Sequence, residues 1–114
     1  MTMSDCIFCK IAAGCIPAKK IYEDEEILAF HDIRPIAPVH FLLIPKVHIN
    51  SLAECDASHQ LLLGKMLLLA PKLAMEQGLD QGFRTMLNTG QDGGQEVFHV
   101  HFHVFGGGER IPRL

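Results

Sequence analysis

Three histidines alternate with apolar residues in the segment 99–105, which reads His-Val-His-Phe-His-Val-Phe. In an extended strand, successive side chains point to opposite faces. We therefore expect His99, His101 and His103 on one face, with neighbouring Cα atoms roughly 6.5 Å apart, and the apolar side chains against a core. A row of imidazoles is costly to bury without partners. The pattern therefore predicts a site where the histidines meet a metal, a phosphate or other polar side chains.

Two chemistries fit this histidine face. In the first, a neutral imidazole attacks phosphorus, while Asn88, Gln95 and the amides of the glycine-bearing loop 89–95 contact the phosphate oxygens. In the second, the three histidines bind zinc and activate water. The outer two of three alternating positions lie about 13 Å apart in a strand, which suits a single ion poorly. The spacing therefore favours nucleophilic phosphorus chemistry.

Two cysteines near the N-terminus form a second candidate site. Cys6 and Cys9 are three residues apart, so both can reach one cation from a helix or turn. A tetrahedral zinc site needs two further ligands from elsewhere in the chain. The alternatives are a redox pair, for which the surrounding sequence lacks a βαβ pattern, or two small buried side chains. His40, at the start of an apolar strand, and His48, just after it, are further candidates for a polar site.

Composition narrows the class of protein. The 114 residues predict a single domain over 1–114. A net charge of −3 without a basic cluster argues against a nucleic-acid partner. No apolar run approaches the ~18 residues that span a bilayer, and residues 1–5 lack the features of a signal peptide. We therefore expect a cytoplasmic protein that does not insert into membranes, with its cysteines reduced or bound to metal.

The elements that must position these residues form an α+β pattern. A short helix should begin after Ser4 or Asp5 and end at Gly14. A long helix capped by Asp56 or Ser58 should run to about Gln77, and Pro71 should kink or divide it. Short runs rich in apolar residues predict strands arranged as an antiparallel meander, at 20–23, 26–32, 39–44, 81–88 and 99–105.

The long helix has more apolar surface than one sheet face can cover. Its leucines and methionines extend around most of its circumference, with Leu61, Leu62, Leu68 and Met75 among them. A helix that is apolar on most sides is buried on two sides. In so small a domain, the second side predicts a subunit interface.

The histidine segment and several other blocks resemble one known family. His-x-His-x-His followed by two hydrophobic residues is the signature of the histidine-triad (HIT) superfamily. The blocks at 16–19, 29–33, 37–46 and 92–95 are similar to its Hint branch, the purine nucleoside phosphoramidases. The resemblance covers nearly the whole chain. It implies a HIT-like fold with a five-stranded, mostly antiparallel sheet, a homodimer that joins two such sheets, and hydrolysis of purine nucleoside 5′-phosphoramidates or related phosphoanhydrides.

The resemblance also implies roles for individual residues. His101 corresponds to the nucleophile that forms a nucleotidyl-histidine intermediate, His103 to a contact of the α-phosphate, and His40 to a supporting histidine. His99 completes the catalytic set. Asp32 corresponds to the acceptor of the ribose hydroxyls, which suits an ionised carboxylate. Glu96 stands where several relatives have a serine that donates to the leaving group. The remaining substrate-binding positions are His31, Ile33, Asn88, Gly94 and Gln95.

Many bacterial members of the family resemble this chain in the N-terminal Cys-x-x-Cys as well. In them the two cysteines join two histidines in a structural zinc site. The matching positions here are Cys6, Cys9, His48 and His99. Four protein ligands leave no open position for catalysis, so the resemblance implies one structural zinc ion per chain.

Two other functions remain open from the sequence. A non-enzymatic sensor of purine nucleotides would use the same pocket with negligible turnover. A dinucleoside polyphosphate hydrolase of another HIT branch would use the same nucleophile, although the Hint-like blocks argue against it.

Overall fold

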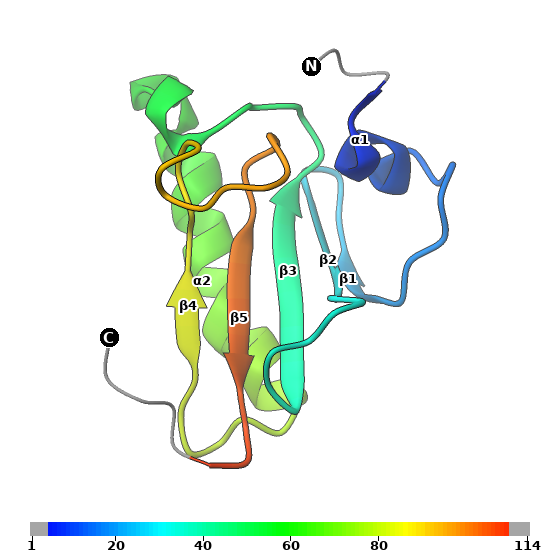
Figure 1. Ribbon diagram of the computed structural model, residues 1–114, viewed down its shortest axis with the longest axis vertical. Helices are drawn as coiled ribbons and strands as arrows, with labels where there is room; N and C mark the ends of the chain where they lie inside the picture. Colours follow the sequence, from blue (N-terminus) through cyan, green and yellow to red (C-terminus); the bar gives the residue numbers. More distant parts are fainter. Residues whose placement is uncertain (1–4, 110–114) are drawn as a thin grey trace.

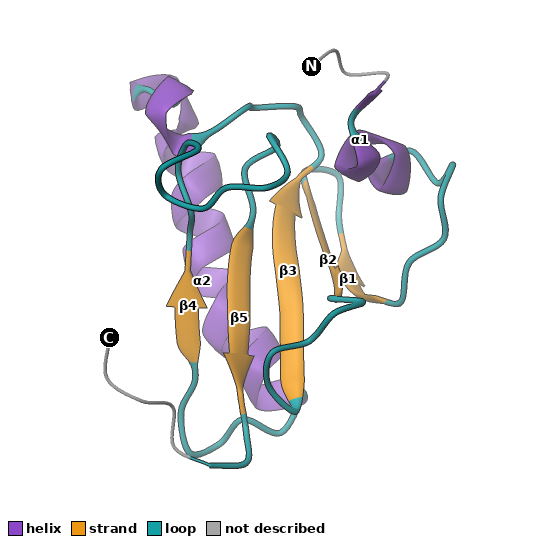
Figure 2. Cartoon of the chain, viewed as in Figure 1, coloured by secondary structure: helices purple, strands orange, loops and turns teal. Residues whose placement is uncertain are grey.

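The computed structural model describes residues 5–109 and has an α+β architecture (Figures 1 and 2). A five-stranded sheet is covered on one face by the long helix α2, and the short helix α1 lies at the other face. In chain order the helices and strands are α1 (Ile7–Ala12), β1 (Lys20–Glu23), β2 (Ile27–His31), β3 (Val39–Pro45), α2 (Gln60–Glu76), β4 (Arg84–Met86) and β5 (Phe102–Gly106). Within the described part of the chain, no helix has the length and apolar character needed to cross a bilayer.

The sheet has the strand order β1-β2-β3-β5-β4, with every pair antiparallel. The predicted hairpin of the first two strands is confirmed. The predicted meander is wrong in one respect, because β5 pairs with both β3 and β4 and thus lies inside the sheet. This position gives β5 a neighbour on each side, as expected for a strand made of buried Val and Phe residues.

The alternation of side chains divides the core into two clusters. Phe41, Phe102 and Val104 point to the face that α2 covers, where they pack against Met66 and Leu73. The opposite face buries another set of apolar side chains against α1, namely Cys6, Phe8, Ile11, Leu28, Phe30, Leu42 and Ile44. His103, which lies between Phe102 and Val104, therefore faces the α1 side, as strand geometry requires.

Helix α2 differs from the expectation at its start and at Pro71. Asp56 caps a short 3₁₀ helix, Ala57–His59, which leads into α2 at Gln60. Pro71 does not divide α2, which is one helix from Gln60 to Glu76. Pro71 lies on the exposed side of α2, so the helical hydrogen bond that a proline cannot make is lost where water can replace it. Gly78 follows the C-cap residue of α2 and has a φ of 89°, the left-handed conformation in which glycine commonly ends a helix.

Helix α1 is capped by a residue other than those expected. The Sγ of Cys6 accepts a hydrogen bond from the main-chain N–H of Cys9 at 3.4 Å, which makes Cys6 the N-cap. Asp5 precedes this cap, and Ser4 lies outside the described residues. The Cys-x-x-Cys motif thus forms the first turn of α1, and both sulfur atoms lie close to the start of the helix.

Three strands are shorter than predicted, and β2 loses one residue at each end of the expected 26–32. β4 covers Arg84–Met86 of the expected 81–88, and β5 begins at Phe102 and not at residue 99. His99 and His101 lie just before β5, at the end of a long connection that starts after β4 (Figure 1). Only His103 of the three is paired within the sheet, opposite Leu42 and Met86.

Candidate active site and metal centre

The three histidines lie together on the α1 side of the sheet although two of them precede the strand. The Phe8 ring makes edge contacts with the rings of His99 and His101, at centroid distances of 5.9 and 5.1 Å. The rings of His101 and His103 are 4.9 Å apart. His99 is fully buried, His101 is 6% exposed and His103 is half-buried. The predicted placement of all three imidazoles on one face is therefore confirmed.

A main-chain carbonyl fixes the state of the His101 ring. The Nδ1 of His101 lies 2.8 Å from the carbonyl oxygen of His99, and because a carbonyl only accepts, Nδ1 carries the proton. In the neutral ring, Nε2 then has a free electron pair. Burial lowers the pKa of His101, although the charges of Asp32 and Glu96 oppose this shift. His101 therefore combines a neutral ring at pH 7 with an available nitrogen, which a nucleophile requires.

His40 and His103 form a hydrogen-bonded pair with a defined direction. The main-chain N–H of Ile36 donates to Nδ1 of His40 at 3.2 Å, so the proton of neutral His40 is on Nε2. That Nε2–H donates to Nδ1 of His103 at 2.9 Å. The proton of neutral His103 is consequently on its own Nε2. His103 can thus donate a hydrogen bond to an anion beside the nucleophilic nitrogen of His101.

Burial keeps both of these rings neutral. It lowers the pKa of His40, and it lowers that of His103 to about 4 with the help of the nearby His101 and His40 rings. Asp32 opposes both shifts, since its Oδ2 lies 3.5 Å from Nε2 of His40. The site therefore offers neutral hydrogen-bond donors, not a cluster of cations.

The residues predicted to contact the nucleoside lie at the end of β2 and in the loop that follows it. His31 ends that strand and is half-buried, as is Asp32, whose Oδ1 accepts from the main-chain N–H of Arg34 at 2.8 Å. Ile33 is 92% exposed. An isoleucine so open to water in a loop beside the histidines is available to contact the apolar face of a ligand.

The glycine-bearing loop is held by a residue that we expected to bind substrate. Gln95 is buried, and its Nε2 donates to the carbonyl oxygens of Asn50 and Val97 at 2.7 and 3.0 Å. Its Oε1 accepts from the N–H of Gly90 at 2.9 Å. Both amide hydrogens are thus engaged within the protein, so in this structure Gln95 supports the loop and does not offer its side chain to a phosphate.

The other predicted residues of this loop are more open. Asn88 is half-buried, whereas Gly94 and Glu96 are exposed. Gly94 has a φ of 83°, a conformation that favours glycine. Glu96 is near enough to His101 for its charge to raise the pKa of that ring.

The four residues named as zinc ligands come together in the fold. One ligand atom each from Cys6, Cys9, His48 and His99 lies within 4.8 Å of all the others. Nδ1 of His99 is 3.3 Å from Sγ of Cys6, and Nδ1 of His48 is 3.1 Å from Sγ of Cys9. Ligand atoms of a tetrahedral zinc ion lie about 3.3 to 3.8 Å apart, given zinc bond lengths of ~2.0 to 2.3 Å. The spacing therefore suits a small tetrahedral cation.

The hydrogen bonds of the two histidines agree with a metal centre. Nε2 of His99 donates to the carbonyl oxygen of Pro45 at 2.7 Å, and Nε2 of His48 donates to Oδ1 of Asn50 at 2.7 Å. Each ring then presents the electron pair of Nδ1 to the sulfur atoms. Burial and the adjacent Cys6 raise the pKa of the Cys9 thiol to about 11, and a cation is the group that would hold such thiols as thiolates. The donor set thus fits zinc.

A second cluster fits a cation less well. Ligand atoms of Asp32, His40 and His103 also lie within 4.8 Å of one another. However, the N–H of Ile36 occupies Nδ1 of His40, so the nitrogen that faces the cluster carries the proton. This arrangement is suited to hydrogen bonding and not to metal binding.

Two side chains of these sites were not identified from the sequence. Phe8 lies between the cysteines and packs against His99 and His101, and Asn50 accepts from His48. Phe8 could have been noticed as the large apolar residue inside the Cys-x-x-Cys motif. The sequence signal for Asn50 was weaker, because it was only a side-chain amide two residues after the candidate metal ligand His48.

Known proteins match this chain over almost its full length. Residues 5–111 match the family model described as "Scavenger mRNA decapping enzyme C-term binding". The protein HitA of Neisseria gonorrhoeae is 59% identical over 104 residues, covering 91% of this chain and 97% of HitA. A HIT-like protein of Synechococcus elongatus is 52% identical and covers 90% of each chain.

Solved structures agree with these matches. A HIT family hydrolase from Legionella pneumophila is 48% identical, with a TM-score of 0.90 over 92% of this chain and 95% of its own. A histidine triad protein from Clostridium difficile is 45% identical, with a TM-score of 0.93 over 100% of this chain and 99% of its own.

Proposed function

Because this chain belongs to the histidine-triad (HIT) superfamily, we propose that it hydrolyses purine nucleoside 5′-phosphoramidates and related phosphoanhydrides. The observation that carries the proposal is the pair formed by His101 and His103. The free electron pair on Nε2 of His101 lies beside a ring whose own Nε2 donates. A nucleophile adjacent to a neutral donor is the arrangement that attack on a phosphorus atom needs.

The proposed reaction has two steps. Nε2 of His101 attacks the α-phosphorus, a N–P bond forms, and the bond from phosphorus to the leaving amine breaks. The amine departs with a proton taken from water. Water then attacks the phosphorus of the nucleotidyl-histidine, the N–P bond to His101 breaks, and the attacking water loses its proton to solvent. This step releases the nucleoside monophosphate and restores neutral His101. His103 donates to the non-bridging oxygens in both steps, and His40 positions His103 through the hydrogen bond of 2.9 Å.

Substrate recognition follows from the residues around the histidines. The carboxylate of Asp32 accepts hydrogen bonds from the ribose hydroxyls. His31 and the exposed Ile33 contact the nucleoside, with Asn88 near the ribose and phosphate. Gly94 and its loop bring main-chain groups close to the phosphate.

The test is the hydrolysis of adenosine 5′-phosphoramidate by the wild type and by His101→Ala. We expect the substitution to reduce turnover about 10³-fold or more while AMP still binds. Acid-quenched wild-type samples should contain a nucleotidyl adduct on His101. A wild type that binds AMP without turnover would support a nucleotide sensor. Faster cleavage of a dinucleoside polyphosphate than of the phosphoramidate would support the other HIT branch.

We also propose that Cys6, Cys9, His48 and His99 hold one structural zinc ion. When bound, the ion would join α1 to the segment that carries His101, because the first two ligands belong to the turn that starts α1 and the last lies two residues before the nucleophile. Metal analysis of the purified protein should give about one zinc per chain. A content far below that value after purification without chelators would contradict the assignment.

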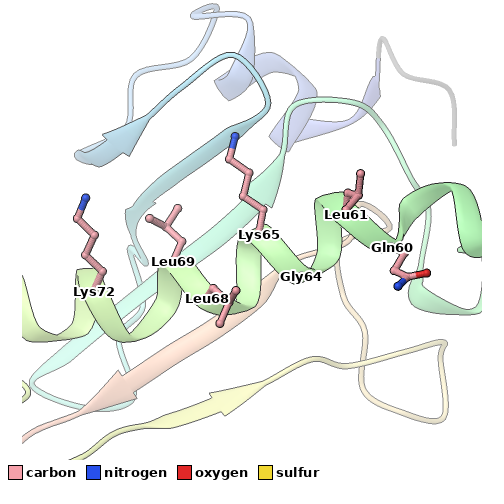
Figure 3. A pocket seen from close by; sticks show the side chains of 7 residues that line it. All are labelled: Gln60, Leu61, Gly64, Lys65, Leu68, Leu69 and Lys72. Carbon is pink, nitrogen blue, oxygen red and sulfur yellow. The ribbon is translucent and has the colours of Figure 1, made fainter.

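Finally, we propose that the chain forms a homodimer through α2 and the β4 edge. Leu61, Leu68 and Met75 are spaced by seven residues on α2 and are 87%, 79% and 62% exposed. Two of them, Leu61 and Leu68, line a groove of about 690 Å³ along the helix, together with Gln60, Gly64, Lys65, Leu69 and Lys72 (Figure 3). The opposite edge strand, β1, is protected by the ion pairs of Glu23 with Lys20 and Lys46, which oppose strand pairing. β4 is therefore the better edge for joining two sheets.

A further inference from the structure

Asn50 lies where the metal centre, the glycine-bearing loop and the histidine segment meet. It belongs to the connection between β3 and α2, and its hydrogen bond with Gln95 places it beside the loop that precedes β5. Its neighbour Ile49 accepts a hydrogen bond from the main-chain N–H of Val100 at 2.8 Å. Asn50 itself contacts both the metal centre and the loop, through its side chain to His48 and through its main chain to Gln95.

The orientation of the Asn50 amide is set by a carboxylate. Nδ2 of Asn50 donates to Oε1 of Glu54 at 3.3 Å. A carboxylate accepts hydrogen bonds, so the NH₂ group must face Glu54 and the oxygen must face the other way. Oδ1 is thus left to accept from Nε2 of His48 at 2.7 Å.

This acceptor selects the form of His48 that binds metal. With the proton held on Nε2, the electron pair of Nδ1 faces Sγ of Cys9 at 3.1 Å. The carbonyl oxygen of Pro45 does the same for His99. A main-chain carbonyl survives any substitution of its own side chain, whereas the acceptor for His48 is a side chain. The metal-binding tautomer of His48 therefore depends on one side chain, which a substitution can remove.

The main chain of Asn50 has a second partner in the loop. Its carbonyl oxygen accepts from Nε2 of Gln95 at 2.7 Å, and Oε1 of Gln95 in turn accepts from the N–H of Gly90. Gln95 is buried, so its contacts are shielded from water. A displacement of the Asn50 main chain would therefore disturb the loop that borders the candidate nucleotide site.

We propose that Asn50 is a positioning residue that couples the two sites. Its side chain holds His48 in the metal-binding tautomer, and its carbonyl anchors the glycine-bearing loop through Gln95. This inference rests on the zinc site proposed above. It goes beyond that site by making the order of the loop depend on the metal, through a residue that contacts neither the ion nor the nucleotide.

The first test measures zinc affinity by competition with a chromophoric chelator. Loss of a hydrogen-bond partner of a ligating histidine costs about 10- to 100-fold in metal affinity. We expect this loss in Asn50→Leu, which keeps the side-chain size and the main-chain carbonyl. Asn88→Leu, which changes the only other asparagine of the chain, is the matched control and should bind zinc as the wild type does.

Rescue separates hydrogen bonding from a general structural effect. In the double variant Asn50→Asp, Glu54→Gln, the acid and the amide exchange places. An acceptor still faces His48, and an NH₂ group on residue 54 still pairs with a carboxylate. We expect this variant to recover most of the affinity that Asn50→Leu loses.

Two NMR measurements complete the test. In the metal-free protein, ¹⁵N shifts of His48 should show the proton on Nε2 in the wild type and a mixture of tautomers in Asn50→Leu. The N–H of Gly90 should be protected from hydrogen exchange in the zinc-loaded wild type, and this protection should fall in the metal-free form and in Asn50→Leu.

The outcomes distinguish this inference from the proposals on which it rests. Wild-type zinc binding together with wild-type affinity in Asn50→Leu would overturn the role of Asn50 alone. Equal protection of Gly90 with and without zinc would overturn the coupling. A wild type that binds no zinc would overturn the metal site and this inference together, whereas the phosphoramidase activity is judged independently by the His101→Ala assay.

Discussion

At the scale of single residues, the main chain decides what the imidazoles of His101 and His40 can do. The carbonyl oxygen of His99 accepts a hydrogen bond from Nδ1–H of His101, and the N–H of Ile36 donates a hydrogen bond to Nδ1 of His40. Rings of the same chemical type thus become a nucleophile and a hydrogen-bond donor. Burial prevents protonation from erasing these differences, because it lowers the pKa of both rings.

The titration of His103 tests this electrostatic description. Burial and the neighbouring rings lower its pKa to about 4, so NMR should show a neutral ring from pH 7 down to about pH 5. In urea its midpoint should return to roughly 6.5. Asp32→Asn should lower the pKa further, because the Asp32 charge raises it. A folded-state midpoint above 6.5 would contradict the description.

The same shift has a consequence for stability. Between about pH 6.5 and pH 4 the unfolded chain binds more protons at His103 than the folded chain does. The contribution of this residue to the free energy of unfolding is therefore complete above pH 6.5 and decreases as the pH falls through that window.

At the scale of elements, the glycine-bearing loop has little room for a side chain at Gly93. The N–H of Gly93 donates to the carbonyl of Gly90 at 3.2 Å, which closes a tight turn. A Cβ at Gly93 would overlap the carbonyl oxygen of Thr89. Because that atom belongs to the main chain, it cannot move without shifting the turn.

The substitution Gly93→Ala should therefore weaken nucleotide binding more than the addition of a single methyl group suggests. We expect a loss of about 1 to 3 kcal/mol in the free energy of unfolding and a clear rise in the dissociation constant for AMP, measured by calorimetry. Gln91→Ala, at an exposed position of the same loop, is the control. Similar AMP affinities for the two variants would show that the turn does not shape the binding site.

At the scale of the whole molecule, α2 has two apolar faces. Met66, Ala70, Leu73 and Ala74 are buried against the sheet, whereas Leu61, Leu68 and Met75 face outwards. One helix face completes the core of the chain, and the other provides apolar surface that a second copy can bury.

Leu68→Glu tests the proposed dimer. Burying an unpaired carboxylate at an apolar interface is costly, and we expect the dimer dissociation constant to rise about 100-fold, or roughly 3 kcal/mol. Light scattering after size-exclusion chromatography measures the change. Leu52→Glu places the same charge at a residue that is 41% exposed outside α2 and should leave the mass unchanged. A monomeric wild type would contradict the proposal.

The sequence by itself determined most of the elements and the residue types available for chemistry. The alternation of His with Val and Phe placed the imidazoles on one face, and the apolar run at 39–44 predicted the central strand β3. The spacing of Cys6 and Cys9 indicated a shared cation. The imidazole face and the strand are confirmed because both depend on local periodicity, which neighbouring positions contain, whereas the shared cation stays a proposal.

The tertiary structure decided which partner each group meets. Cys6 and His99 are 93 residues apart in the chain, and β5 enters the sheet between β3 and β4. The two amide hydrogens of Gln95 go to carbonyls of Asn50 and Val97, which turns an expected substrate contact into a support of the loop. The tautomers of His40, His99 and His101 likewise depend on main-chain groups brought near by folding, and that of His48 depends on the side chain of Asn50. Such pairings arise from packing between distant segments, and no local pattern specifies them.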